Sequence, residues 1–317
     1  TLKDNQIFLR KKKLKKKINK IDKHKSKHEI KINVGFPSNK IYKNILPYCD
    51  GVGFSRIEFL LSKILNNIHP YKYIEFIGNK NFSNEIADHI RPALKILRKQ
   101  KKEFWIRTDD FSVEQLIKMD FGKNYETSEK ISSTGYRGIR RSNREKNIII
   151  PVLMAIKKLK LEGFENIGIF PPMVNSVNEY KKWLDTLNQY NLGSLKKGLM
   201  VETPRAALMI EEFLPYIKFV IFGMNDLTSF LLAVDRNNLN IRQMFNESDP
   251  VVVKVINEVI KKCKNKNVKT YLSGPLTENK NILHKFLLNG LSGVTINPDI
   301  STINKVKKNI FELEKIL

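Results

Sequence analysis

From residue 31 onward, short apolar runs alternate with amphipathic helical stretches, and this alternation limits the fold more than any other feature of the chain. Strands that alternate with helices pair in parallel, because each helix carries the chain back to the start of the next strand. Eight such units predict an α/β fold, a closed (β/α)8 TIM barrel. The predicted strands are Ile32–Phe36, Val52–Ser55, Glu103–Thr108, Ile167–Pro171, Gly198–Glu202, Phe219–Gly223, Lys269–Ser273 and Gly293–Asn297.

Amphipathic segments between these strands read as the barrel helices. The connection between Asp109 and Asn166 is too long for a simple crossover, so it is expected to hold a helical insertion that includes Ile148–Leu161. Residues 1–30 are lysine-rich and form a basic arm or linker, which leaves 31–317 as the barrel domain. The other predicted helices are Ser83–Gln100, Asn178–Gln189, Arg205–Leu214, Pro250–Lys264 and Asn279–Asn289.

Composition narrows the class of protein. No apolar run reaches the length of about 18 residues that a membrane span needs, and the N-terminus does not resemble a signal peptide. The two cysteines, Cys49 and Cys263, fit no metal-ligand spacing, so a reducing cytoplasm is the expected location. Much of the net charge of +25 lies in the first 31 residues, and lysine is spread evenly elsewhere; no aromatic stacking motif accompanies the charge, which disfavours nucleic acid as a partner.

The stretch from Phe219 to Asn238 joins a buried strand to polar side chains. Four apolar residues end at Gly223, and Asn225 and Asp226 follow directly. Asp226 could cap the next helix, or it could belong to a functional site, because barrel enzymes hold their chemistry at the carboxyl ends of the strands. Arg236 then returns towards the same rim.

Other predicted strands also end in polar residues, as a barrel with a functional mouth requires. Glu202 and Asp226 follow neighbouring strands and form a sparse oxygen-ligand set that suits Mg²⁺. Guanidinium groups bind phosphate and carboxylate through paired hydrogen bonds. Each arginine alone reads as a surface ion pair, whereas four around one rim favour a site for a phosphorylated carboxylate. These four are Arg56 and Arg107 at strand ends, Arg137 in the insertion, and Arg236.

Several motifs, in order, resemble the C-terminal barrel of the phosphoenolpyruvate-utilising enzymes. This family includes phosphoenolpyruvate synthase, pyruvate phosphate dikinase and enzyme I of the sugar phosphotransferase system. The segment FVIFGMNDLTSFLLAVDRNN resembles the long family signature, and GVGFSRIEFLL resembles G-[IV]-G-L-x-R-x-E-F. FWIRTDDF, GYRGIRR, GLMVETPRAA and TINPD also have counterparts, and NVGFP is most similar to the synthase branch.

The resemblance implies roles for individual residues. Glu202 and Asp226 would ligate Mg²⁺, and Asn225 would contact the substrate phosphate. Arg56 and Arg107 would be catalytic and would hold phosphoenolpyruvate or pyruvate together with Arg236, and Arg137 would assist. The family passes a phosphoryl group between an enolate oxygen and a histidine on a swivelling domain, which here would come from a missing segment or a partner chain. A homodimer is expected by the same analogy.

Three departures from the family pattern bear on activity. The family has an acid/base cysteine after the seventh strand, whereas here Ser273 is the nearest equivalent with one gap, and Leu272 occupies the ungapped position. Ser229 replaces a signature glutamine, and none of the five histidines lies in a phosphohistidine-like context. Two alternatives therefore stand beside a phosphotransferase: a reduced module that only binds the ligand, and a scaffold whose basic arm docks nucleic acid or an acidic partner.

Overall fold

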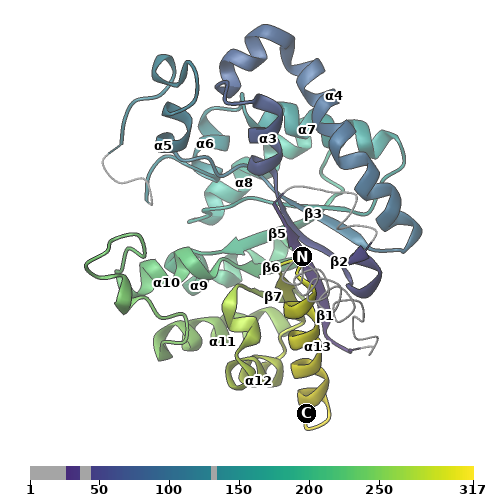
Figure 1. The fold of residues 1–317 in the computed structure, drawn as a ribbon, viewed down its shortest axis with the longest axis vertical. Coiled ribbons are helices and arrows are strands. Elements are labelled where there is room, and N and C mark those ends of the chain that lie inside the picture. Colours follow the sequence, from purple (N-terminus) through teal and green to yellow (C-terminus); the bar gives the residue numbers. More distant parts are fainter. Residues whose placement is uncertain (1–25, 36–43, 130–133) are drawn as a thin grey trace, which may run out of the picture.

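The computed structural model of the chain describes residues 26–35, 44–129 and 134–317. Its strands form a closed parallel barrel in chain order, with β8 paired to β1, and this confirms the predicted (β/α)8 architecture (Figure 1). The strands are β1 Glu29–Val34, β2 Gly51–Arg56, β3 Glu103–Arg107, β4 Ile167–Phe170, β5 Lys196–Val201, β6 Phe219–Phe222, β7 Lys269–Ser273 and β8 Gly293–Ile296.

The first strand begins earlier than predicted, at Glu29 instead of Ile32. Its backbone pairs with β8 from Glu29 opposite Gly293 onward, although Glu29 and Lys31 are charged. Lys31 is 2% exposed, and its ammonium lies 2.9 Å from the Glu29 carboxylate and 4.5 Å from the centre of the Trp105 ring. The charged residues are therefore paired within the barrel. The predicted strand end at Phe36, like residues 1–25 of the predicted arm, lies outside the described residues.

Aromatic side chains fill the interior of the barrel. Trp105 stacks on Phe219 with ring centroids 3.9 Å apart, and Phe170 meets the same ring edge-on. A second, larger core lies between the strands and the surrounding helices, so each strand is buried on both faces. Because side chains fill the interior, a ligand can bind only at the end of the barrel. The end formed by the carboxyl ends of the strands is called the mouth. The inner cluster comprises Phe54, Trp105, Phe170, Met200, Phe219, Ile221 and Tyr271.

Helices surround the strands, and α4 and α7 lie side by side on one flank (Figure 1). No helix in the described part of the chain is both long and apolar enough to cross a lipid bilayer. The barrel helices are α3 Ile57–Leu65, α4 Pro70–Lys99, α7 Ile149–Leu161, α8 Val177–Gln189, α10 Met224–Leu232, α11 Pro250–Lys264, α12 Lys280–Asn289 and α13 Ile300–Glu314.

Two helix predictions need correction. The predicted helix Ser83–Gln100 is the second part of α4, which begins at Pro70 and is kinked at Gly78, where φ is 76°. The predicted helix Arg205–Leu214 is broken into the short helix α9, Pro204–Leu208, and the 3-10 turns Ile210–Glu212 and Leu214–Tyr216. Pro215, the second residue of the last turn, lacks an N–H donor, so the segment cannot continue as an α-helix through this position.

The helical insertion predicted after the third strand is also confirmed. It contains α5, Val113–Ile117, and α6, Ile139–Arg144, ahead of α7. Ser112 begins α5 with a reciprocal capping box to Gln115. The insertion therefore has structure of its own, and α5 and α6 lie above α9 and α10 in the view of Figure 1.

Candidate functional site

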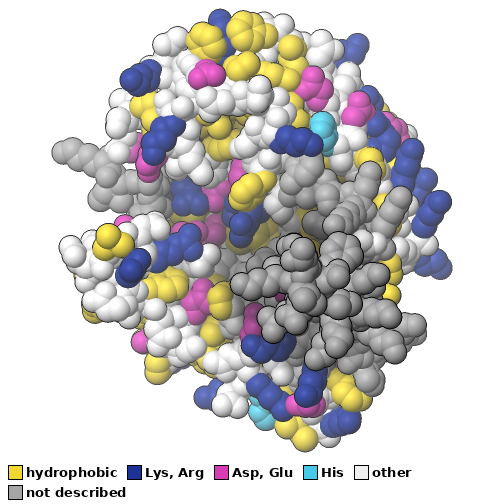
Figure 2. All heavy atoms as spheres, viewed as in Figure 1, with side chains coloured by type: hydrophobic (Ala, Val, Ile, Leu, Met, Phe, Trp, Pro, Cys, Tyr) yellow, Lys and Arg dark blue, Asp and Glu magenta, His cyan; other side chains and the backbone are white. Residues whose placement is uncertain are grey.

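Two adjoining cavities, of about 700 and 340 Å³, open at the carboxyl ends of the strands. Arg56, Arg107, Asn225 and Asp226 line both cavities. Figure 2 shows basic and acidic side chains gathered in a hollow between the part that carries α5 and α6 and the part that carries α9 and α10. The structure brings all eight predicted site residues to this mouth: Arg56, Arg107, Arg137, Glu202, Asn225, Asp226, Arg236 and Ser273.

Local structure explains how the chain delivers these side chains. Arg56, Arg107 and Ser273 are the last residues of β2, β3 and β7, where parallel strands turn outward. Asn225 and Asp226 lie in the first turn of α10. Of the two alternatives for Asp226, capping of this helix is excluded, because the N-cap is Gly223 and no side chain caps it. The Asp226 carboxylate is therefore not held by a capping bond.

Glu202 is the more buried of the two candidate metal ligands, at 1% exposure. Its Oε1 accepts a hydrogen bond of 2.5 Å from the backbone N–H of Met173. A Cβ atom at Gly223 would lie only 2.6 Å from Glu202 Oε2, so only glycine at position 223 leaves space for this carboxylate. Burial, together with the nearby charges of Asp226 and Asp110, raises the pKa of Glu202 to about 8.

This pair of carboxyl groups fits a divalent cation. A carboxyl group whose ionisation is opposed by a neighbouring carboxylate is stabilised in its charged form when a cation lies between the two. Within the described ranges, no cluster of three or more His, Cys, Asp or Glu side chains is arranged to hold a metal ion. A cation bound by Glu202 and Asp226 would therefore take its remaining ligands from water or substrate oxygens, a habit typical of Mg²⁺.

Two of the arginines are held by acidic residues that sequence reasoning missed. Arg107 pairs with Glu58 and lies 3.3 Å from Asp110. Arg137 binds Asp110 through two hydrogen bonds, of 2.8 and 2.5 Å. The Nε of Arg107 is buried and has no hydrogen-bond partner. Glu58 lies two residues after Arg56 in GVGFSRIEFLL, and Asp110 lies three residues after Arg107 in FWIRTDDF. This closeness in sequence to the arginines is the signal from which their pairing could have been predicted.

The other two arginines, Arg56 and Arg236, have no acidic partner in the described part of the chain. Arg56 is half-buried and packs over Phe54 and Phe59, with its guanidinium carbon 5.2 and 5.8 Å from the ring centroids. Burial and the neighbouring Arg107 lower the pKa of Arg56. Arg236 is exposed, and neither Arg56 nor Arg236 forms an ion pair with any described residue. Guanidinium groups that line a cavity and have no ion-pair partner attract an anionic ligand.

Leu272 and Ser273, the two residues considered as replacements for the acid/base cysteine, lie in different environments at the end of β7. Leu272 is fully buried in the core between strands and helices, so it does not reach the mouth. Ser273 lines the smaller cavity, and its Oγ donates a hydrogen bond of 2.5 Å to the carbonyl oxygen of Phe222. The hydroxyl proton of Ser273 is thus already engaged with the backbone.

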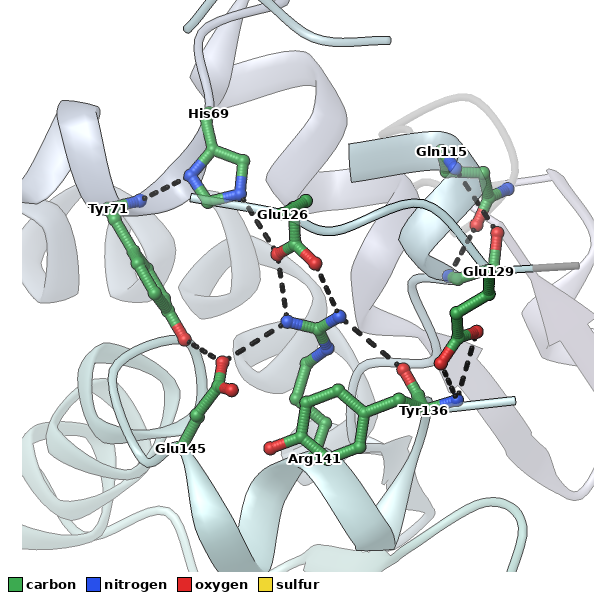
Figure 3. A network of polar contacts seen from close by, with 9 residues as sticks. His69, Tyr71, Gln115, Glu126, Glu129, Tyr136, Arg141 and Glu145 are labelled. Atoms are coloured by element: carbon green, nitrogen blue, oxygen red, sulfur yellow. Dashed lines mark hydrogen bonds and ion pairs between the residues drawn. The ribbon is translucent and has the colours of Figure 1, made fainter. Parts of the chain in front are cut away.

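A buried polar network holds the insertion against the barrel (Figure 3). Arg141 is 1% exposed and binds both carboxylate oxygens of Glu126 at 2.8 Å. It also contacts Glu145, which accepts a hydrogen bond from the Tyr71 hydroxyl. His69, at the start of α4, lies 3.3 Å from the same Glu126. The network anchors the segment that carries Arg137.

Replacing Arg141 by methionine is expected to lower the free energy of unfolding by about 3–5 kcal/mol, because Glu126 would keep a buried charge without its main partner. Arg140→Met is the matched control. Arg140 is partly exposed and lies 4.0 Å from Glu179, so its loss should cost about 1 kcal/mol or less. Denaturant unfolding followed by circular dichroism measures both. Equal losses in the two variants would contradict the anchoring role.

Comparison with known proteins agrees with the barrel and its mouth. A family model described as "PEP-utilising enzyme, PEP-binding domain" matches residues 10–315. A probable phosphoenolpyruvate synthase of Archaeoglobus fulgidus is 34% identical over 295 residues, which cover 90% of this chain and 38% of that protein. A second, of Methanocaldococcus jannaschii, is 33% identical over 283 residues, 88% of this chain and 23% of that protein.

A phosphoenolpyruvate synthase of Helicobacter pylori is 29% identical over 317 residues, again 90% of this chain and 38% of that protein. The chain thus spans less than two fifths of the length of these relatives. Since the family model matches nearly all of the sequence, the chain belongs to the family of PEP-utilising enzymes and carries their PEP-binding domain.

Proposed function

We propose that the barrel mouth binds phosphoenolpyruvate or pyruvate together with Mg²⁺. One observation carries this proposal: two mutually repelling carboxyl groups and two unpaired guanidinium groups line the same pair of adjoining cavities. Glu202 and Asp226 would hold the cation. Arg56 and Arg236 would bind the phosphate and carboxylate, with Arg107 and Arg137 behind them and Asn225 at the phosphate.

The reaction proposed for this site is phosphoryl transfer to or from a phosphohistidine on a swivelling domain, in the same longer chain or on a partner. The arginines would neutralise the phosphoryl group as it moves. When bound, Mg²⁺ would stabilise the negative charge on the substrate's carboxylate and enolate oxygens. A cytoplasmic location and a homodimer belong to the same proposal, by analogy with the family.

A reduced module that only binds the ligand is the second candidate, and Ser273 is the observation that favours it. The hydroxyl of Ser273 is a far poorer acid than a thiol, and it is engaged by the Phe222 carbonyl. Such a module would bind phosphoenolpyruvate normally but would not transfer a proton to or from its methylene carbon.

Thermal unfolding tests the binding proposal. Mg²⁺ with phosphoenolpyruvate, or with oxalate as an analogue of the enolate, is expected to stabilise the protein by about 2–3 kcal/mol at 100 times the dissociation constant. Neither the ligand nor the cation alone should give the full effect, since each supplies ligands or charge for the other. No shift under any combination would refute both the phosphotransferase and the binding module.

The affinity for Mg²⁺ is expected to fall by roughly tenfold per pH unit below pH 8, because the cation requires Glu202 in its ionised form. The free protein should show the opposite trend. A carboxyl whose pKa is raised on folding binds more protons in the folded state, so stability falls as pH rises from about 4.5 to 8. Calorimetric titration and denaturant unfolding at several pH values measure the two trends.

Glu202→Gln provides the control for this pH dependence. Asp109 is also buried, and burial together with Glu58 and Asp110 raises its pKa to about 7, so it contributes to the same loss of stability. The glutamine variant should therefore flatten the decline only in part. A variant that keeps the full decline between pH 7 and 8 would show that Glu202 titrates normally.

A further inference from the structure

Interconversion of phosphoenolpyruvate and pyruvate needs a group that moves a proton at carbon. The methylene carbon of the enolate must gain a proton to become the methyl group of pyruvate, and must lose it in reverse. Neither thiol of the chain is available for this step. Cys49 and Cys263 are buried outside both cavities, and burial raises the pKa of each to about 12.

Glu247 is a buried acid without a partner in the same region. It precedes α11 and is 9% exposed, yet its carboxyl group makes no hydrogen bond or ion pair with any described residue. Burial raises the pKa of Glu247, and the positive charge of Arg236 opposes this rise. A largely buried acidic side chain that makes no hydrogen bond or ion pair with a described residue calls for an explanation.

Glu247 itself lines neither cavity, but its carboxyl lies beside Gly274, which lines the smaller one. Gly274 follows Ser273 at the end of β7 and lines the smaller cavity. A Cβ atom built on Gly274 would lie 3.9 Å from both carboxylate oxygens of Glu247. The φ angle of Gly274 is 82°, a conformation that favours glycine, so position 274 contributes no side chain between Glu247 and this turn.

Other carboxyl groups around the mouth are already engaged. Glu58 and Asp110 hold Arg107 and Arg137, and Glu278 binds the ammonium of Lys305 at 2.7 Å. Glu202 and Asp226 are the proposed cation ligands. Glu247 alone among these acids combines a raised pKa, closeness to the end of β7 and the lack of any hydrogen bond or ion pair with a described residue.

We propose that Glu247 is the acid/base group that exchanges a proton with the methyl carbon, in place of a thiol. In one direction, the neutral carboxyl gives its proton to the methylene carbon of the enolate, which yields pyruvate and the Glu247 carboxylate. In the other direction, the carboxylate removes a methyl proton from pyruvate, and the electron pair of the C–H bond moves to the enolate. This assignment rests on the proposed function.

Proton exchange tests it without any phosphoryl partner. The full chain is incubated with Mg²⁺ and pyruvate in D₂O, and loss of the methyl signal is followed by NMR. The wild-type protein should exchange the methyl protons of pyruvate faster than a protein-free buffer that contains Mg²⁺. Glu247→Gln should lower the protein-dependent exchange rate by about 100-fold or more. Glu247→Asp, which keeps a shortened acid, should restore part of the rate.

Binding and folding are measured on the same variants. The affinity of Glu247→Gln for oxalate with Mg²⁺, measured by thermal stabilisation, should remain within threefold of the wild-type affinity. This result would separate proton transfer from ligand binding. Glu258→Gln, which removes an exposed carboxyl from α11, is the control for a change of charge. Circular dichroism checks that each variant is folded.

Four outcomes would overturn the assignment. The first is oxalate binding by wild type with no proton exchange above buffer, which would leave a binding module. The second is an unchanged rate in Glu247→Gln, and the third is loss of exchange in Ser273→Ala or Glu278→Gln instead. The fourth is absence of oxalate stabilisation in wild type, which would remove the proposed function itself and the role of Glu247 with it.

Discussion

Asp226→Ala is expected to abolish the stabilisation that Mg²⁺ and oxalate give, while leaving the free protein as stable as before or slightly more stable. Asp226 lines both cavities and raises the pKa of Glu202, so its carboxylate repels its neighbour when no cation is present. Removing it relieves that repulsion, and it also removes one of two protein ligands. Loss of groups that only support a ligand costs about 10- to 100-fold in metal affinity, so loss of a ligand should cost more.

Thermal unfolding with and without Mg²⁺ and oxalate measures both effects. Asp185→Ala is the matched control, because it removes an exposed carboxyl from α8 that lines neither cavity. The control should keep the full stabilisation. If Asp226→Ala also keeps it, the carboxylate pair does not hold the cation and the metal assignment is wrong.

Arg56→Met and Arg107→Met are expected to separate ligand binding from stability. Arg56 has no ion pair with the described residues, so its loss should change the free energy of unfolding by about 1 kcal/mol or less. It should weaken phosphoenolpyruvate binding by about 10- to 100-fold, since hydrogen bonds to charged groups contribute roughly 1.5–3 kcal/mol.

Arg107→Met should do more, because it leaves the buried Glu58 carboxylate without its partner. We expect a loss of about 3–5 kcal/mol in stability in addition to weaker binding. Calorimetric titration gives the affinities, and denaturant unfolding gives the stabilities. Arg98→Met, at the end of α4 and away from the mouth, controls for loss of a positive charge. Normal binding in Arg56→Met would exclude this guanidinium from the site.

Much of the architecture could be read from local pattern. Buried parallel strands are continuous apolar runs, and Phe219–Phe222 shows why such a run is recognisable without any knowledge of its neighbours. The carboxyl ends of parallel strands must meet at one rim, so residues that follow the runs, such as Arg107 and Glu202, were predictable as neighbours although 95 residues separate them.

Local pattern failed where contacts from distant segments decide the structure. Lys31 and Glu29 read as polar and yet belong to β1, because each charge finds its partner inside the barrel. The apolar spacing of 205–214 predicts one helix, but α9 ends at Leu208 and the rest of the segment forms two 3-10 turns.

The amino-acid sequence by itself therefore determined the barrel, its order of strands and the set of charged residues at its mouth, since these follow from periodicity and parallel pairing. Only the tertiary structure decided which of those charges are neutralised and which remain available. Glu58 engages Arg107, whereas Arg56 and Glu247 form no ion pair with any residue that the structure describes, and the Glu247 carboxyl lies beside Gly274. Such pairings depend on distances of a few ångströms between segments far apart in the chain, and burial, which sets the cost of each unpaired charge, exists only once the chain has folded.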